Sequence, residues 1–282
     1  MYYGKKIMNN SIFKIMQCFS IKSAFLILLF FNVIYKAHSQ KLVRSEVIVL
    51  SYNIHHANPP SQSEVINLDT IATIIKNSKA DIVGLQEVDI YTERSGKKLH
   101  MAKVLAEKAG FEYWYFSKSI NFQGGEYGTA ILSKFPLSDT ITTKLPNPKN
   151  AEPRTLSLAN IHINPKLEIK IANTHLDYTD ASNNLAQVSA IRKILSSEDK
   201  PVIITGDFNV VPESSSMNHL LEIFSSSCTD VCDFTSSAQQ SESTIDYILY
   251  KSNTIDVLEH KVLKETFASD HFPVKARFLI YN

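Results

Sequence analysis

The stretch PVIITGDFN, residues 201–209, decides the fold because it changes from apolar to polar within a single residue step. Its first half is apolar and β-branched, which is typical of a buried strand. Asp207 and Asn209 follow that strand directly. The stretch therefore predicts a strand. Because Asp and Asn are also common turn formers, its polar end has two interpretations, a simple turn or part of a functional site.

The same change recurs at the ends of other predicted strands. SYNIHH closes a strand at residues 51–56, GLQEVD at 84–89 and NTHLD at 173–177. Asp246 begins another strand, and SDH at 269–271 precedes the last one. A single polar end is most simply a turn, but six in one chain are poorly explained by coincidence. Sites concentrate in loops at strand ends, so we expect these side chains to meet in one site.

Short strand patterns alternate with helical ones along the chain. We expect helices around residues 68–75, over 99–109 with Gly110 as C-cap, and from Ser182, a candidate cap, to Leu195. No Gly/Pro/Ser-rich break divides residues 40–282, so we expect one α/β domain with two sheets packed face to face and helices outside. Strands are expected at residues 46–54, 81–86, 111–116, 128–132, 155–163, 169–174, 201–205, 245–250, 254–263 and 274–281.

The mixture of residue types at the strand ends indicates hydrolysis with a divalent metal. Carboxylate and amide oxygens are hard ligands, suited to Mg²⁺, Mn²⁺ or Ca²⁺ rather than to zinc. Histidines beside such a centre can bind phosphate oxygens or transfer protons near neutral pH. Metal, acid and histidine together are typical of metal-assisted hydrolysis of a phosphate ester.

Taken in order, the motifs resemble the endonuclease/exonuclease/phosphatase superfamily, and within it the secreted bacterial metal-dependent hydrolases. GDFN alone is a weak match, but GDFN with LQE, THLD and SDH is specific. The resemblance runs from about Val47 to Ile280 and implies the DNase-I-like fold, an α/β four-layer sandwich with two mixed or antiparallel sheets, and a Mg²⁺ or Mn²⁺ cofactor. The matching motifs are SYNIHH, GLQEVD, GTAILSKFP, NTHLD, GDFN, IDYIL and SDHFPV.

The resemblance also implies a role for each matched residue. Asp207 would orient or deprotonate the attacking water, and Asp246 would pair with His271 and favour its protonated form. Three residues would hold the metal: Glu87, Asn53 and Asp270. Four would act on the phosphate or on the attacking water: Asp207, Asn209, His271 and His175. Asp246 would complete the catalytic set through its pairing with His271.

Two further residues are candidates for substrate binding. Arg154 precedes a predicted strand, and a guanidinium suits bidentate recognition of phosphate. Tyr127 lies in the GGEYG stretch at residues 124–128, which lacks the spacing and the lysine of a P-loop. We expect that stretch to be a flexible loop at the rim of the site. Arg94 offers the same chemistry as Arg154, but we expect it to form surface salt bridges.

The first 39 residues have the order of a secretory signal peptide. A basic lead without acids precedes an apolar run at residues 24–34, and the small residues Ala37 and Ser39 suit a cleavage site. An uncleaved anchor is the alternative, but crossing a bilayer takes about 20 apolar residues. We therefore expect a protein that is secreted or periplasmic after cleavage, without a stable membrane anchor.

Removal of this leader would change the charge balance. It holds five of the 29 basic residues and none of the 28 acids, so residues 40–282 have a net charge of −4. Proteins that hold duplex nucleic acid usually show a basic excess. The charge balance favours a small or lipid-like phosphate ester as the substrate. It allows nucleic acid as a substrate but not as a tightly held binding partner. We expect the protein to be a monomer.

Three functions remain open on the sequence alone. The first is a phosphodiesterase or phosphatase, and the second is an extracellular endonuclease or exonuclease acting on DNA or RNA. The third is a binding module that kept the fold without catalysis, which would predict losses at the metal and acid positions, and none is found. Cys228 and Cys232 either pair across their short loop or remain free thiols.

Overall fold

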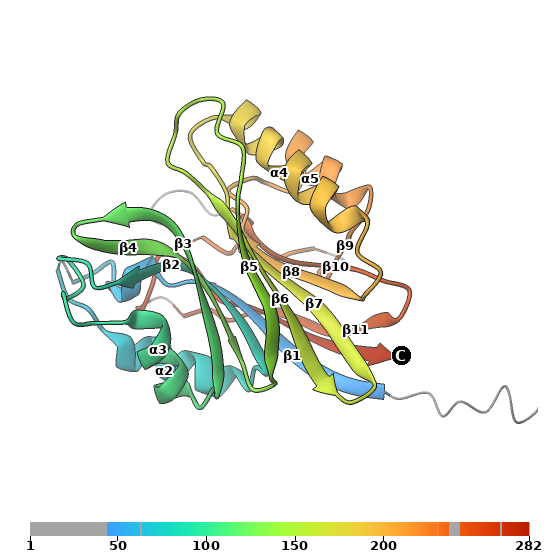
Figure 1. Ribbon diagram of the computed structural model, residues 1–282, viewed down its shortest axis with the longest axis horizontal. Helices are drawn as coiled ribbons and strands as arrows, with labels where there is room; N and C mark the ends of the chain where they lie inside the picture. Colours follow the sequence, from blue (N-terminus) through green and yellow to red (C-terminus); the bar gives the residue numbers. More distant parts are fainter. Residues whose placement is uncertain (1–43, 63, 230, 237–242, 266, 282) are drawn as a thin grey trace, which may run out of the picture. The chain divides into compact units, whose positions relative to one another are not determined.

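The computed structural model describes residues 44–62, 64–229, 231–236, 243–265 and 267–281. The predicted signal peptide, residues 1–39, lies outside the described residues. Within them, the strands form two six-stranded sheets (Figure 1).

The first sheet has the strand order β11-β12-β1-β2-β4-β3. Strands β1 and β2 are parallel, and the other neighbours are antiparallel, so the sheet is mixed. Its strands are β1 (Arg44–Asn53), β2 (Ile82–Ile90), β3 (Tyr113–Phe122), β4 (Gly125–Ser133), β11 (Ile255–Val262) and β12 (Val274–Tyr281).

The second sheet repeats this plan with the order β5-β6-β7-β8-β10-β9. Here β7 and β8 form the parallel pair, and the other neighbours are antiparallel. Each sheet therefore has one parallel pair near its middle. The strands are β5 (Leu137–Lys144), β6 (Thr155–Asn164), β7 (Leu167–His175), β8 (Val202–Asp207), β9 (Ser225–Ser226) and β10 (Asp246–Lys251).

Three apolar layers hold these elements together. The inner faces of the two sheets meet through aliphatic side chains such as Val49 and Ile171. The outer face of the first sheet packs against α2 (Leu68–Ser78) and α3 (Met101–Ala109). The outer face of the second packs against α4 (Ala181–Ser196) and α5 (Ser215–Leu221), as Figure 1 shows. The predicted four-layer α/β sandwich is confirmed.

Local sequence determines the helix ends. Helix α3 ends at Gly110, whose φ of 82° makes it the left-handed C-cap that the sequence predicted. Helix α4 is capped by Asp180 and not by Ser182, because the Asp180 carboxylate accepts hydrogen bonds from the backbone N–H groups of Ser182 and Asn183.

Several strands differ from their predicted ranges. Strand β2 continues to Ile90 instead of ending at residue 86, and the strand predicted at 111–116 lies at Tyr113–Phe122. Neither β5 nor α5 was expected. Strand β5 lies at the edge of its sheet and is largely exposed, so it lacks the apolar run on which the prediction of strands depended.

The GGEYG stretch is not the flexible loop that the sequence predicted. Gln123 and Gly124 have φ values of 47° and 78°, as a two-residue type I′ turn requires. Phe122 pairs with Gly125 across this turn, so the segment closes the β3–β4 hairpin. Tyr127 therefore lies in a regular strand, where it is 8% exposed.

Cys228 and Cys232 form a disulfide, which decides between a bridge and free thiols. Among the described residues, no helix has the length and apolar character needed to cross a membrane.

Candidate active site

The ends of the central strands bring the predicted motifs together. The register of the parallel strands β7 and β8 places His175 beside Asp207. Strand β10 runs antiparallel to β8 and places Asp246 opposite Asp207. In the other sheet, Asn53 ends β1 next to Gln86 of β2. The carboxyl ends of the parallel strands therefore supply the site from both sheets.

A β-bulge determines the position of Glu87. Strand β2 pairs regularly with β4 as far as Leu85 and resumes one residue out of step at Val88, so Gln86 and Glu87 lie in the bulge. Glu87 has a φ of 58°, a left-handed conformation that glycine adopts far more readily than other residues. For a side chain other than glycine this conformation costs on the order of 1–3 kcal/mol, and such strain is common at functional sites.

Asn53 links two carboxylates at the floor of the site. Its Nδ2 donates to Glu87 Oε1 at 3.1 Å and to Asp207 Oδ2 at 2.9 Å. Its Oδ1 accepts a hydrogen bond from the backbone N–H of His55 at 3.1 Å. Asn53 is buried, so it holds both carboxylates in place from beneath.

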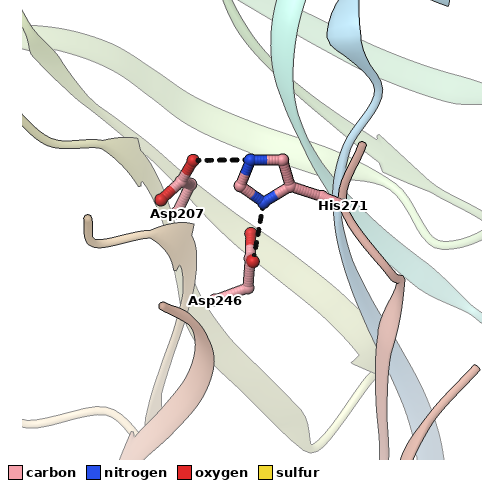
Figure 2. Close-up of side chains that lie close together, drawn as sticks. All are labelled: Asp207, Asp246 and His271. Carbon is pink, nitrogen blue, oxygen red and sulfur yellow. Dashed lines mark hydrogen bonds and ion pairs between the residues drawn. The ribbon is translucent and has the colours of Figure 1, made fainter. Parts of the chain in front are cut away.

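Asp207 lies at the centre of a group of carboxylates and histidines. Its Oδ2 is 3.5 Å from Nε2 of His175 and 3.7 Å from Nε2 of His271. Nδ1 of His271 lies 2.8 Å from Oδ2 of Asp246. Figure 2 shows the His271 ring between two carboxylates, with one at each ring nitrogen.

Burial and neighbouring charges set the protonation of this group. Burial, followed by the nearby Asp246, raises the pKa of Asp207 to about 7. Burial alone would lower the pKa of His271, but Asp246 and Asp207 raise it well above its usual value. Burial and the positive charge of Arg154 hold the pKa of His175 well below its usual value. At neutral pH, His271 is therefore a cation, His175 is neutral, and Asp207 is poised for proton transfer.

Asn209 fastens the loop that carries Asp207. It has a φ of 53°, and its backbone N–H donates to Asp207 Oδ1 at 3.0 Å. Its Nδ2 donates to the carbonyl of Leu176 at 3.0 Å. Asn209 therefore fixes the Asp207 carboxylate and joins the GDFN loop to the THLD loop.

Glu87 has the properties of a ligand for a divalent cation. Burial would raise the pKa of its carboxyl, but His56, His175 and other neighbours hold it well below its usual range. Its Oε2 lies 3.8 Å from Nδ1 of His56, which is too far for a hydrogen bond. Asp270 brings a second carboxylate to the same pocket. Two hard oxygen donors of this kind fit Mg²⁺ or Mn²⁺.

A second group of potential metal ligands fits a cation less well. Asp207, Asp246 and His271 bring three ligand atoms within 4.8 Å of one another. The protonated imidazole of His271 has no lone pair to offer a metal, and metal binding would require its deprotonation. The chemistry of this group therefore favours proton transfer, whereas Glu87 and Asp270 are carboxylates that each offer oxygen donors to a cation in the pocket.

Arg154 lies in the wall of the pocket as a buried cation. Its side chain is 4% exposed, and its Nη1 lies 3.1 Å from Glu152 Oε1. Its Nε is buried without a hydrogen-bond partner among the described residues. A buried donor of this kind is costly unless a ligand or water completes it, so Arg154 is suited to binding an anion.

Arg94 also lines the pocket, which corrects the expectation of a surface salt bridge. Its Nε and Nη2 donate to the two carboxylate oxygens of the buried Asp89 at 2.8 and 3.0 Å. Its guanidinium lies 4.5 Å from the ring centre of Phe122 and 5.5 Å from that of Tyr127. Arg94 does form an ion pair, with Asp89, but the continuation of β2 beyond the bulge places this pair at the pocket instead of elsewhere on the surface.

The adjacent histidines after β1 occupy a strained turn at the pocket. They begin the short helix η1 (His55–Ala57) with φ values of 45° and 42°. Nδ1 of His55 donates to the carbonyl of Asn58 at 2.8 Å, whereas His56 lies beside Glu87. The first histidine therefore stabilises the turn, and the ring of the second lies beside the Glu87 carboxylate.

Tyr178 is a pocket residue that was not predicted. It follows the THLD motif directly and is 72% exposed at the pocket. The backbone of the preceding residue, Asp177, is anchored at both of its polar groups. Its N–H donates to Oε1 of Gln187 at 2.9 Å, and its carbonyl accepts a hydrogen bond from Nδ2 of Asn184 at 2.8 Å. The sequence feature that points to Tyr178 is its position as an aromatic residue directly after the THLD motif.

The pocket has a volume of about 780 Å³. Two predicted site residues, Asn53 and Asp246, lie behind its wall and hold residues that face it. The other predicted residues line the pocket: Glu87, Asp207, Asn209, His175, Asp270, His271, Arg154 and Tyr127.

The sequence matches the Endonuclease/Exonuclease/phosphatase family over residues 50–271, a span that includes all of these site residues. The chain belongs to this family. No curated protein sequence matches it significantly.

Solved structures show that this family member has the DNase-I-like fold. An endonuclease/exonuclease/phosphatase from Beutenbergia cavernae has a TM-score of 0.72 and 20% identity, covering 83% of this chain and 72% of that one. The mannosyl-6-phosphatase of Bacteroides thetaiotaomicron has a TM-score of 0.67 and 21% identity, with coverages of 82% and 99%. ANGEL2, a 2′,3′-cyclic phosphatase, has a TM-score of 0.64 and 20% identity, with coverages of 84% and 95%.

Proposed function

We propose that this protein is a divalent-metal-dependent hydrolase that cleaves a small phosphate ester by in-line attack of water. The observation that carries the proposal is the position of Asp207. Its carboxylate lies 3.5 and 3.7 Å from two histidines and shares the amide of Asn53 with Glu87. A base, two imidazoles and a carboxylate suited to a metal converge on one pocket. Membership of the family supports hydrolysis of phosphate esters.

Glu87 and Asp270 would hold the cation, Mg²⁺ or Mn²⁺. When bound, it would neutralise charge on a phosphoryl oxygen as the ester is cleaved. Asn53 keeps the Glu87 carboxylate in position from beneath. The lowered pKa of Glu87 keeps this carboxylate anionic across the neutral range.

Asp207 would accept the proton of the attacking water. The backbone N–H of Asn209 fixes its Oδ1, and the side chain of Asn53 fixes its Oδ2. Its pKa of about 7 is suited to general-base catalysis near neutral pH, where a base must be both partly deprotonated and strong enough to take a proton.

Three side chains would bind the phosphate oxygens. His271 is a cation because of Asp246, and its Nε2 faces the group around Asp207. His175 supplies a neutral imidazole, and Arg154 has a buried Nε that lacks a hydrogen-bond partner among the described residues. Donors held in place in this way stabilise the charge that develops in the transition state.

The leaving group would be a small polar alcohol. The pocket includes the neutral polar side chains of Asn58, Ser236 and Ser243 and the ring of Tyr178. The net charge of −4 for residues 40–282 disfavours tight binding of a polyanion. Structural neighbours include a mannosyl-6-phosphatase and a 2′,3′-cyclic phosphatase, so a sugar phosphate and a cyclic phosphate are substrates to test.

We propose that the protein acts outside the cytoplasm as a monomer. The order of residues 1–39 supports export, and so does the Cys228–Cys232 disulfide, because such bridges are rare in the reducing cytosol. Fractionation of the host cells and light scattering on the purified protein would test these two statements.

The test of the proposed function is hydrolysis by the purified protein with Mg²⁺ or Mn²⁺ and with EDTA. The substrates would be a sugar phosphate, a 2′,3′-cyclic nucleotide, bis-p-nitrophenyl phosphate, sphingomyelin, plasmid DNA and RNA. We expect metal-dependent cleavage of a small ester and its loss in His271→Ala. Preferential cleavage of the polymers would favour a nuclease, and cleavage of sphingomyelin would identify a lipid substrate. No cleavage by folded, metal-bound protein would contradict the proposal.

A further inference from the structure

A polar cluster lies in the apolar layer between the two sheets, next to the bulge that carries Glu87. Asn173 of β7 is its centre and is completely buried. Its Nδ2 donates across the gap between the sheets to the carbonyls of Leu85 at 2.9 Å and Ala130 at 3.0 Å. These carbonyls belong to the last regular pair of β2 and β4 before the bulge.

The amide oxygen of Asn173 is equally engaged. It accepts hydrogen bonds from Gln86 Nε2 at 2.7 Å and from Thr205 Oγ1 at 3.1 Å. Gln86 is the first residue of the bulge, and Glu87 follows it. An asparagine amide can donate two hydrogen bonds and accept two, and here it makes all four. Asn173 therefore holds β2 at two consecutive residues immediately before Glu87.

Gly84 makes this contact between the sheets sterically feasible. A Cβ at this position would overlap Thr205 Oγ1 and lie 2.8 Å from Oδ1 of Asn173. A larger residue would force the second sheet away and lengthen the hydrogen bonds of Asn173. The absence of a side chain at Gly84 therefore allows the two sheets to approach closely, and this approach allows Asn173 to reach the residues before and in the bulge.

We propose that Asn173 is a positioning residue for Glu87. By fixing the β2 bulge from the opposite sheet, it turns the Glu87 carboxylate toward the pocket and so determines the affinity for the divalent cation. The part that concerns the cation rests on the proposed function. Removing a group that orients a metal ligand typically costs about 10–100-fold in metal affinity or activity, and we expect a loss of that size here.

The test compares Asn173→Leu with Asn160→Leu in the full chain. Asn160 is a matched control because it is a buried asparagine of the same sheet whose Nδ2 donates to Asp139 of β5 at 2.7 Å. In titrations with Mn²⁺, Asn173→Leu should weaken binding about 10–100-fold, whereas Asn160→Leu should bind like the wild type. Turnover of Asn173→Leu should recover toward the wild-type rate at saturating Mn²⁺, because Glu87 itself is still present.

A second readout does not need the metal. In EDTA, amide hydrogen exchange over residues 85–90 should accelerate in Asn173→Leu and remain as in the wild type in Asn160→Leu. If the wild type binds no Mn²⁺, the metal part of the proposed function is wrong, and the exchange data still decide whether Asn173 holds the bulge.

A milder variant keeps the proposal falsifiable if Asn173→Leu does not fold. Gln86→Met removes one hydrogen bond to Asn173 and leaves both carbonyl contacts intact, so it should show a smaller loss in the same direction. The proposal is overturned if the folded variants match the wild type in Mn²⁺ affinity and in exchange over residues 85–90.

Discussion

Nδ1 of His271 lies 2.8 Å from Oδ2 of Asp246, and this contact leaves the opposite ring nitrogen facing Asp207 (Figure 2). Asp246 is buried, and its second carboxylate oxygen has no hydrogen-bond partner among the described residues. Its charge therefore acts on the imidazole with little screening by solvent. The pair determines both the orientation of His271 and its protonated state.

Asp246→Asn should lower the pKa of His271, because the nearest negative charge that favours the imidazolium is removed. The alkaline limb of the profile of kcat/KM against pH should move to lower pH. We expect kcat/KM at neutral pH to fall about 10²–10³-fold, the range for loss of one donor that stabilises the charge of the transition state. An alkaline limb at the wild-type position would show that Asp246 does not control His271. Asp256→Asn, at an exposed residue of β11, is the control.

Glu87→Gln should weaken the binding of Mg²⁺ or Mn²⁺, because a neutral amide replaces the charged oxygen donor that hard cations prefer. Isothermal titration would measure the affinity, and activity lost in EDTA should return when the metal is restored. Glu107→Gln, in the exposed pair with Lys103, is the control. Equal affinity of Glu87→Gln and the wild type would place the cation elsewhere in the pocket.

The metal-free protein should lose stability in acid partly through Glu87. A carboxyl whose pKa is lower in the folded state than in the unfolded state stabilises the fold above its unfolded-state pKa. That contribution is lost as the pH falls toward the folded-state pKa. In urea unfolding between pH 7 and pH 3 with EDTA, the stability of Glu87→Gln should therefore fall less steeply than that of the wild type. Parallel curves would show that other carboxyls account for the acid sensitivity.

Tyr178→Ala should reduce turnover of substrates whose leaving group is a ring. An aromatic residue held on an anchored backbone can stack on a sugar or a base, and such stacking is worth about 1–3 kcal/mol, or roughly 10–100-fold in kcat/KM. Glycerol phosphate, which has no ring, should be cleaved at the wild-type rate. Tyr178→Phe should keep most of the activity. A uniform loss on both kinds of substrate would argue against a role in selecting the leaving group.

The sequence predicted which side chains lie around one pocket because these residues stand at strand ends. The carboxyl ends of parallel strands meet at one edge of a sheet, so His175 meets Asp207 in one sheet and Asn53 meets Gln86 in the other. Packing of the two sheets then brings Asn53 to Asp207. Alternation of apolar residues also placed most strands correctly. The edge strand β5 was missed because exposed polar residues give no such pattern.

The bulge that positions Glu87 corresponds to a break in the alternation of apolar residues along β2. Val83 and Leu85 point to the layer beneath α2 and α3, and the same layer resumes with Val88 and Ile90. The shift by one residue marks the bulge. Contacts such as Arg94 with Asp89 follow from packing around that bulge, so sequence patterns alone do not reveal them.

The most direct test of the account is turnover by Asp207→Asn. The substitution is nearly isosteric but removes the carboxylate that would accept the proton of the attacking water. In protein that is folded and binds Mn²⁺, hydrolysis of the best small phosphate ester should fall about 10²–10⁴-fold, with little change in KM. Turnover close to the wild-type rate would show that Asp207 is not the base and would contradict the proposed chemistry of this pocket.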